Sequence, residues 1–202
     1  MKIKSSSESE VGLKIPYLVN IRLFLQAFLL ICLVMKPSLA DVKMKIEDLL
    51  DDLEVTSSSL EASRIRTEIW GYWLKDHTYE KDNDLIASGL SHFYRGNYQK
   101  ADQIFTKIIL SDPNYVEGWN KRATIRYLLG DFQKSLEDIN QVLTRQPRHF
   151  GAISGTALIH MQNLRYKKAL DSYRLLERID PNNDDSKRMI PMLEARIYGE
   201  SL

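Results

Sequence analysis

The stretch PNYVEGWNKRATIRYLLGDFQKSLEDINQVLTRQP, residues 113–147, decides the fold, because both of its ends are prolines of a regular series. Pro113, Pro147 and Pro181 are evenly spaced along the chain. A proline cannot donate the hydrogen bond that a helix interior needs, so a regular series of prolines marks regular helix ends. A period of this length predicts a stack of helical units.

Other positions of the chain keep the same register. Blocks of the same length, counted from Asp82, Val116 and Phe150, carry large residues at positions 4, 17 and 24 and small residues at positions 8 and 20. Small residues let two helices of one block approach closely, and the large ones fill the space that remains. In order of position, these residues are Leu85, Trp119 and Ile153; Gly89, Ala123 and Ala157; Tyr98, Phe132 and Tyr166; Ala101, Ser135 and Ala169; and Phe105, Ile139 and Tyr173.

This pattern resembles the tetratricopeptide-repeat family, whose helix–turn–helix unit has the same length as the interval between the prolines, and the resemblance covers residues 82–183. It implies an all-α, right-handed α-solenoid of three helix pairs. The pairs are expected at 82–115, 116–149 and 150–183.

The turn inside each pair has its own signature. Gly96-Asn97 and Gly130-Asp131 are expected to end one helix and cap the next. The third repeat has Leu164 and Arg165 at these positions, so a looser turn is expected there, with Asn163 supplying the bend.

A stack of repeats needs a cover at each end. Residues 41–81 predict an N-terminal helix pair packed on the first repeat, with Trp70 and Trp73 facing the core. Residues 184–202 predict a C-terminal capping helix. Pro191 is best tolerated in a first turn, so this helix is expected to begin near Met189.

The first 40 residues have the order of a secretory signal peptide. Basic residues precede an apolar run over 23–35, and small residues stand at Ser38 and Ala40. As a helix this run spans about 20 Å, less than the ~30 Å hydrocarbon core of a membrane. The order predicts an exported, bacterial-type protein cleaved after Ala40 that is periplasmic or secreted. The alternative is an inner-membrane protein anchored by an uncleaved signal.

The sequence offers no site for catalysis. It has no glycine-rich phosphate loop, no Cys/His cluster with metal spacing and no nucleophile elbow, which predicts a protein that is not an enzyme and has no cofactor or metal. The 28 basic and 27 acidic residues argue against nucleic acid as a partner, and no small-molecule substrate is expected. His92, Arg126 and His160 share position 11, which predicts polar contacts between repeats. The acidic pairs at 51–52 and 184–185 are interpreted as solvated helix surface or helix capping.

The resemblance also implies a concave groove that binds a protein or peptide. Positions 2, 5, 9, 12 and 13 of the first helix of each repeat would line it. These residues are Asn83, Ile86, Leu90, Phe93 and Tyr94; Glu117, Asn120, Thr124, Tyr127 and Leu128; and Gly151, Ser154, Leu158, Met161 and Gln162. None of them is lysine or arginine, so affinity for a partner is expected to depend weakly on salt.

Relatives that hold the acidic tails of heat-shock chaperones use lysine, arginine and asparagine at such positions. Ile86 stands where the first clamp lysine would be, and buried carboxylates would lack a cationic partner here. The groove therefore favours an apolar helix or extended segment of a partner protein. The alternative is a structural component of an envelope assembly that makes contact through its convex face or its N-terminal helices. The partner, the organism, the oligomeric state and any covering of the groove by the N-terminal pair stay open.

Overall fold

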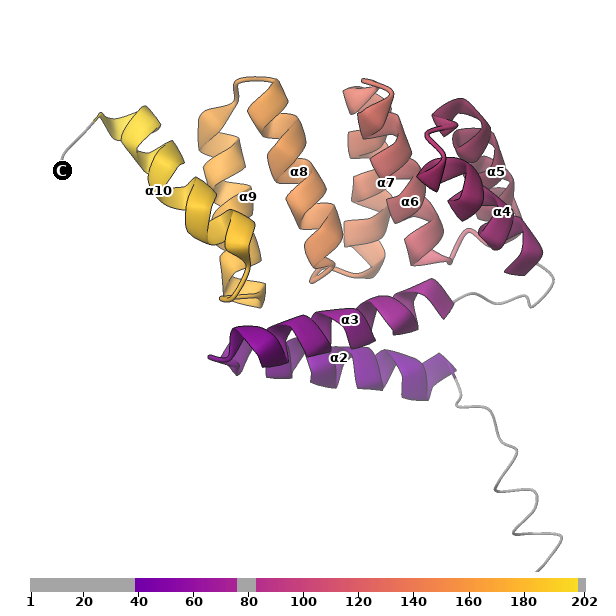
Figure 1. Ribbon diagram of the computed structural model, residues 1–202, viewed down its shortest axis with the longest axis horizontal. Helices are drawn as coiled ribbons and strands as arrows, with labels where there is room; N and C mark the ends of the chain where they lie inside the picture. Colours follow the sequence, from indigo (N-terminus) through magenta and orange to yellow (C-terminus); the bar gives the residue numbers. More distant parts are fainter. Residues whose placement is uncertain (1–38, 76–82, 200–202) are drawn as a thin grey trace, which may run out of the picture. The chain divides into compact units, whose positions relative to one another are not determined.

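The computed structural model describes residues 39–75 and 83–199, and every regular element within them is a helix (Figure 1). The N-terminal pair consists of α2 and α3, the three repeats are α4–α5, α6–α7 and α8–α9, and α10 follows the last repeat. The bounds are α2 Leu39–Val55, α3 Ser59–Lys75, α4 Asn83–Tyr94, α5 Tyr98–Ser111, α6 Val116–Leu128, α7 Phe132–Arg145, α8 Phe150–Gln162, α9 Tyr166–Ile179 and α10 Asp184–Tyr198. The expected all-helical solenoid of helix pairs is confirmed.

The three turns inside the repeats have one geometry. Gly96, Gly130 and Leu164 all adopt a positive φ, of 75°, 77° and 55°. In each turn this residue donates its N–H to the carbonyl three residues back, and the next residue donates to the carbonyl five back. The expectation of a looser third turn bent at Asn163 is therefore wrong, because Leu164 accepts the left-handed conformation that glycine adopts in the other two.

Capping of the second helices differs among the repeats. The Asp131 carboxylate accepts a hydrogen bond from the Lys134 N–H at 3.3 Å and so caps α7. Asn97 makes no such side-chain bond at the start of α5, contrary to expectation. Arg165 stands at the same place before α9 and has no acceptor to offer.

The N-terminal pair packs mainly on the third repeat, and the prediction that it packs on the first repeat is wrong. Its apolar face shares one buried cluster with α8, α9 and α10, and only the end of α3 reaches the first repeat, through Leu74. The cluster contains Ile46, Leu49, Leu50, Leu53, Ala62, Ile65, Ile69, Trp73, Phe150, Ile153, Ala157, Ala169, Leu170, Tyr173, Leu176, Ile179 and Leu193.

Helix α3 runs past the turns that join one repeat to the next. The Tyr115 hydroxyl donates to the Leu74 carbonyl at 3.0 Å, and the Trp73 ring stacks on His149. In the middle of α3, Arg66 binds Asp180 at 2.8 Å. A helix of 17 residues is about 25 Å long, which is enough to reach three turns in succession. The reach of α3, rather than its place in the sequence, decides where the pair packs.

Helix α10 begins at Asp184, ahead of the expected start at Met189. Asn183 caps it by accepting the Ser186 N–H at 3.0 Å, and this cap starts the helix early. Pro191 consequently lies inside the helix, on its exposed side.

The expected signal peptide lies outside the described residues except for its last two, and Ala40 is in the first turn of α2. None of the described helices combines the length and the apolar character that crossing a membrane requires.

Candidate partner-binding groove

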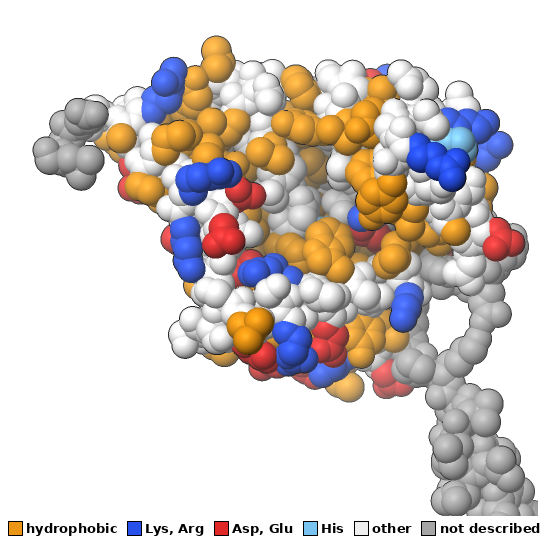
Figure 2. All heavy atoms as spheres, viewed as in Figure 1, with side chains coloured by type: hydrophobic (Ala, Val, Ile, Leu, Met, Phe, Trp, Pro, Cys, Tyr) orange, Lys and Arg blue, Asp and Glu red, His pale blue; other side chains and the backbone are white. Residues whose placement is uncertain are grey.

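The first helices of the second and third repeats, α6 and α8, contact each other and form the walls of a cleft of about 120 Å³. Its lining is mixed, with small, hydroxyl-bearing and apolar side chains and one aromatic ring. The lining residues are Asn120, Ala123, Thr124, Tyr127, Ser135, Ile139, Gly151, Ala152, Ser154, Gly155 and Leu158. Six of the expected groove residues thus meet around one depression. Figure 2 shows a hollowed face with hydrophobic side chains gathered in and above the hollow.

The expected groove residues divide by exposure. Those at positions 9, 12 and 13 are exposed or half-buried, whereas most of those at positions 2 and 5 are less accessible. Exposed are Asn83, Tyr94, Thr124, Leu128, Leu158 and Gln162; half-buried are Leu90, Phe93, Tyr127, Gly151, Ser154 and Met161; buried are Ile86, Glu117 and Asn120. Ile86 and Glu117 do not line the cleft, and Asn120 lines it with only 5% of its surface exposed, which narrows the expected site.

Helix α3 covers the first turns of α6 and α8. The Trp70 ring stands edge-on against Phe150 with ring centres 5.3 Å apart, and Lys121 of α6 lies over the same ring at 5.0 Å. A Cβ atom on Gly151 would come within 2.7 Å of Trp70, so only glycine permits this approach. The N-terminal pair therefore closes the beginning of the groove in the second and third repeats.

Both tryptophans of α3 contribute to this cover. Trp73 is buried and stacks on His149 with ring centres 3.9 Å apart, and Trp70 is half-buried with its ring edge-on to Trp73 at 5.2 Å. The expectation that Trp70 and Trp73 face the core is confirmed. The surface they cover belongs to the second and third repeats, which the sequence pattern did not indicate.

Beneath α3 lies a buried polar cluster centred on Glu117. Its carboxylate pairs with Lys121 at 2.7 Å, accepts a hydrogen bond from Asn120 at 2.9 Å and faces His149 Nε2 at 3.4 Å. His149 Nδ1 accepts the Ala152 N–H, which assigns the ring proton to Nε2, toward Glu117. Burial alone raises the pKa of Glu117, but the nearby His149 ring and the charge of Lys121 outweigh it and hold that pKa below its usual value. Lys121 and Glu117 thus neutralise each other at the closed end of the groove.

The open half of the groove consists of the accessible residues at positions 9, 12 and 13. Its rings are held in place by one another: Phe93 and Tyr94 meet edge to face at 5.2 Å, and Tyr127 packs on Phe132 at 5.5 Å. The Tyr127 hydroxyl also accepts a hydrogen bond from Gln162 at 3.4 Å, which links the second and third repeats. This half presents apolar surface and neutral hydrogen-bonding groups without a charged side chain.

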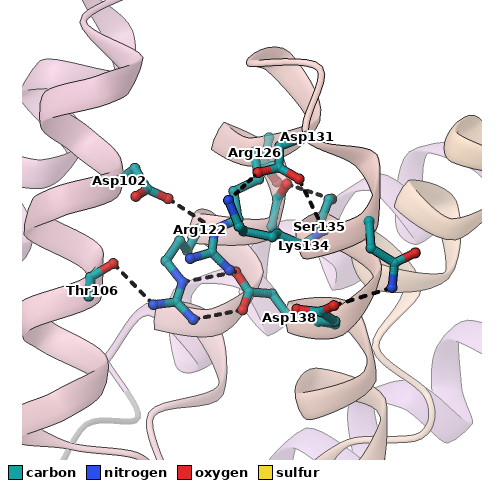
Figure 3. Close-up of polar contacts among 12 residues, drawn as sticks. Asp102, Thr106, Arg122, Arg126, Asp131, Lys134, Ser135 and Asp138 are labelled. Atoms are coloured by element: carbon teal, nitrogen blue, oxygen red, sulfur yellow. Dashed lines mark hydrogen bonds and ion pairs between the residues drawn. The ribbon is translucent and has the colours of Figure 1, made fainter.

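A buried ionic network, which sequence analysis missed, joins the first and second repeats behind the groove (Figure 3). Arg122 binds the Asp138 carboxylate through two nitrogens, at 2.7 and 2.9 Å, and Arg126 binds the same carboxylate at 2.9 Å. Arg126 also reaches Asp102 of α5, and Arg122 reaches Thr106. The carboxylates neutralise the positive charge of both arginines, so neither arginine is free to bind an anion in the groove.

The remaining polar residues that the sequence singles out lie on several different helices. Arg126 joins two repeats as expected of position 11, while the Nδ1 atoms of His92 and His160 are buried without a hydrogen-bond partner. Within residues 39–75 and 83–199, no group of three or more His, Cys, Asp or Glu side chains could hold a metal ion. Asp51 is exposed and pairs with Arg148. Asp184 and Asp185 lie in the first turn of α10.

Paired antiparallel helices stacked side by side, with a groove along their first helices, define the protein as a helical repeat solenoid of the tetratricopeptide type. A sequence model of the tetratricopeptide-repeat family matches residues 120–184. A TPR repeat-containing protein of Rhizobium etli is 29% identical over 157 residues, which are 78% of this chain and 76% of the relative. Residues 120–184 thus resemble the tetratricopeptide-repeat family in sequence, and the stacked helix pairs have the fold of that repeat.

Solved structures show the same fold. The first TPR of Spaghetti bound to an HSP90 peptide is similar with a TM-score of 0.57 and 19% identity, covering 61% of this chain and 98% of that one. The Yersinia enterocolitica type III secretion chaperone SycD, in complex with a peptide of the translocator YopD, is similar with a TM-score of 0.55 and 11% identity, covering 59% and 96%.

Proposed function

We propose that the protein is a non-enzymatic adaptor that binds an apolar helix or extended segment of a partner protein in the open half of its groove. The observation that carries this is the run of accessible side chains on three neighbouring helices: Tyr94, Tyr127, Leu128, Leu158 and Met161. Aromatic and aliphatic anchors in such a depression supply most of the energy of peptide binding. Thr124, Ser154 and Gln162 add neutral groups that can bind a peptide backbone.

Relatives of the same fold bind peptides, which supports an adaptor role. One was solved with an HSP90 peptide and another with a YopD peptide. Sequence identities of 19% and 11% are high enough to support the shared fold but too low to indicate the same partner. The chemistry of the partner is therefore inferred from the residues of this groove. Ile86 is buried, and Lys121, Arg122 and Arg126 are committed to internal carboxylates. Among the groove residues that the structure describes, none is a free cation of the kind that an acidic chaperone tail needs, and an apolar segment suits them better.

The covered beginning of the groove sets the register of the partner. A segment lying along α4, α6 and α8 meets α3 where Trp70 crosses Gly151, so it is confined to the residues at positions 9, 12 and 13. We therefore expect a short segment with few anchors, rather than a long peptide that fills the whole concave face.

A structural role in an envelope assembly is the second candidate. Met44, Val55 and Leu60 of the N-terminal pair and Leu110 of α5 are exposed apolar residues away from the groove. Such residues would be the contacts if the protein joined an assembly through its outer surfaces.

Site-specific photo-crosslinking in the native cell separates the two candidates. A photoreactive amino acid at Leu128, in the groove, is expected to capture a discrete partner, while the same amino acid at Leu110 on the outside of α5 captures none. Capture at Leu110 alone would favour the structural role. Mass spectrometry of the crosslinked peptide then gives the bound segment.

We also propose that the protein is exported across a membrane. The basic, apolar and small-residue order of residues 1–40 supports cleavage after Ala40 and a periplasmic or secreted protein, with an uncleaved inner-membrane anchor as the alternative. N-terminal sequencing of the protein from the native cell is expected to begin at Asp41. A sequence that begins at Met1 or Lys2 would contradict cleavage.

A further inference from the structure

An open pocket of about 410 Å³ lies between the start of α9 and the end of α10, away from the groove. Its lining combines four cationic side chains with apolar ones. The lining residues are Leu164, Arg165, Tyr166, Lys167, Lys168, Arg196 and Ile197. None of them lines the cleft between α6 and α8, so this pocket is a separate surface.

None of the four cations of this pocket forms an ion pair with a carboxylate of residues 39–75 or 83–199. In the part of the chain that the structure describes, Arg165, Lys167 and Lys168 take part in no ion pair, and Arg196 lies over the Tyr166 ring at 4.5 Å. Their field extends to α8: burial lowers the pKa of His160, and the positive charges of Lys168 and Arg165 lower it further. The pocket is therefore electropositive and open to solvent.

The second repeat shows what occupies the equivalent place. Asp131 and Lys134 stand one repeat length before Arg165 and Lys168. The Asp131 carboxylate lies 2.6 Å from Lys134 Nζ and 3.3 Å from the Lys134 N–H, so the second repeat carries its own anion at the start of α7. In the third repeat an arginine replaces that aspartate, while the backbone turn and the lysine are kept. The third repeat therefore has an arginine where the second has a carboxylate, so an anion at the start of α9 would have to come from a bound ligand.

We propose that this pocket binds a carboxylate of an acidic peptide segment in which aspartate or glutamate neighbours an apolar residue. The carboxylate takes the place that Asp131 fills in the second repeat, between Lys168 and the first N–H groups of α9. Arg165 and Arg196 offer planar donors from either side of the pocket. Leu164, which is 70% exposed, and Ile197 supply apolar surface for the adjoining side chain. This site is independent of the apolar groove.

The test uses the chain from Asp41 onward together with the full-length protein, and two short fluorescein-labelled peptides of equal length. One peptide alternates glutamate and leucine, and the other has glutamine for glutamate. Fluorescence anisotropy at low salt is expected to show binding of the glutamate peptide and at least about tenfold weaker binding of the glutamine peptide, the effect of losing a hydrogen bond between charged groups.

The decisive variant is Arg165→Asp, which rebuilds the arrangement of the second repeat. It is expected to weaken binding of the glutamate peptide at least about tenfold while the melting temperature stays the same or rises, because the new carboxylate caps α9. Lys107→Asp on α5 makes the same change in net charge and is expected to leave the affinity unchanged.

Three results would overturn the proposal. One is equal affinity for the two peptides, and another is an unchanged affinity in Arg165→Asp. The third is binding of phosphatidylglycerol vesicles, lost in Arg165→Asp, without any binding of the glutamate peptide, which would assign the pocket to a lipid surface.

Discussion

Leu164 is the residue at which this repeat protein departs most clearly from ordinary backbone preference. It adopts φ 55° in a turn where the other two repeats have glycine, and its side chain is largely exposed. The left-handed conformation costs a residue with a Cβ atom about 1–2 kcal/mol. The turn hydrogen bonds of the third repeat are nevertheless kept, so the stack imposes this conformation on leucine.

We expect Leu164→Gly to raise the free energy of unfolding by about 1 kcal/mol, because relief of the left-handed strain exceeds the entropy cost of glycine. Urea denaturation measures this. The reciprocal change Gly130→Ala, at a position with open space around it, is expected to lower the stability by about 1–2 kcal/mol. Loss of stability in Leu164→Gly would mean that the leucine side chain contributes more than its backbone costs.

Gly151 shows how close α3 comes to α8. Adding a methyl group there places a carbon 2.7 Å from Trp70, and overpacking of this kind costs about 1–3 kcal/mol. Gly151→Ala is therefore expected to lower the unfolding midpoint in urea. Gly71→Ala in α3 is the matched control, because nothing lies within 4 Å of its new methyl group, and it is expected to be neutral or stabilising by up to about 1 kcal/mol. Equal effects of the two changes would show that Trp70 does not cover α8 in solution.

At the scale of helices, α5, α6 and α7 are joined by the network around Asp138. This carboxylate is buried and accepts hydrogen bonds from both Arg122 and Arg126. Removing one partner of a buried charged network leaves uncompensated charge, which typically costs about 3–5 kcal/mol. We expect a loss of this size in Asp138→Ala by chemical denaturation. The neighbouring Glu137→Ala, on the exposed side of α7, is expected to change stability by less than about 0.5 kcal/mol. A loss in Asp138→Ala as small as that of Glu137→Ala would contradict this role of the network.

The buried carboxylate of Glu117 on α6 predicts a pH dependence of stability. Because the pKa of Glu117 is lower in the folded chain, its ionised form stabilises the fold above the unfolded-state value of about 4.3, and this contribution is lost as the pH falls through the folded-state pKa. The free energy of unfolding of wild type, measured in urea at pH 7, 4 and 3, is therefore expected to fall more steeply than that of Glu117→Gln. Glu177→Gln, at an exposed site of α9, is expected to follow wild type. Identical pH profiles of wild type and Glu117→Gln would show that this carboxylate is not held in the ionised form.

At the scale of the whole molecule, the helical repeats could be predicted from the sequence, but the place where the N-terminal pair packs on them could not. The regular register of prolines, small residues and aromatics predicts the helix pairs, because each position has a local packing reason. The amphipathic pattern of α2 and α3 predicts burial of Trp73 but does not say against which repeat. That choice depends on the length of α3 and on the room at Gly151, which are properties of the assembled fold.

The same reasoning separates the predictable part of the site from the rest. Periodicity places Tyr127 and Leu158 on the first helices of their repeats, and they do line one cleft. It cannot show that Glu117 is buried, since His149, which faces it, comes from the turn before the third repeat. Nor does spacing reveal that Arg122 and Asp138, on different helices of one repeat, form a bidentate ion pair.

The central claim is that the open half of the groove binds a partner segment through apolar anchors. The most direct measurement is the dissociation constant of the crosslinked partner segment for wild type and Tyr127→Ala at low and at high salt, with Tyr198→Ala on α10 as the matched control. A hot-spot anchor is worth at least about 2 kcal/mol, so Tyr127→Ala is expected to weaken binding at least about 30-fold, with less than about threefold dependence on salt and no effect of Tyr198→Ala. An unaltered affinity in Tyr127→Ala together with a steep salt dependence would contradict the claim and show that the partner binds elsewhere.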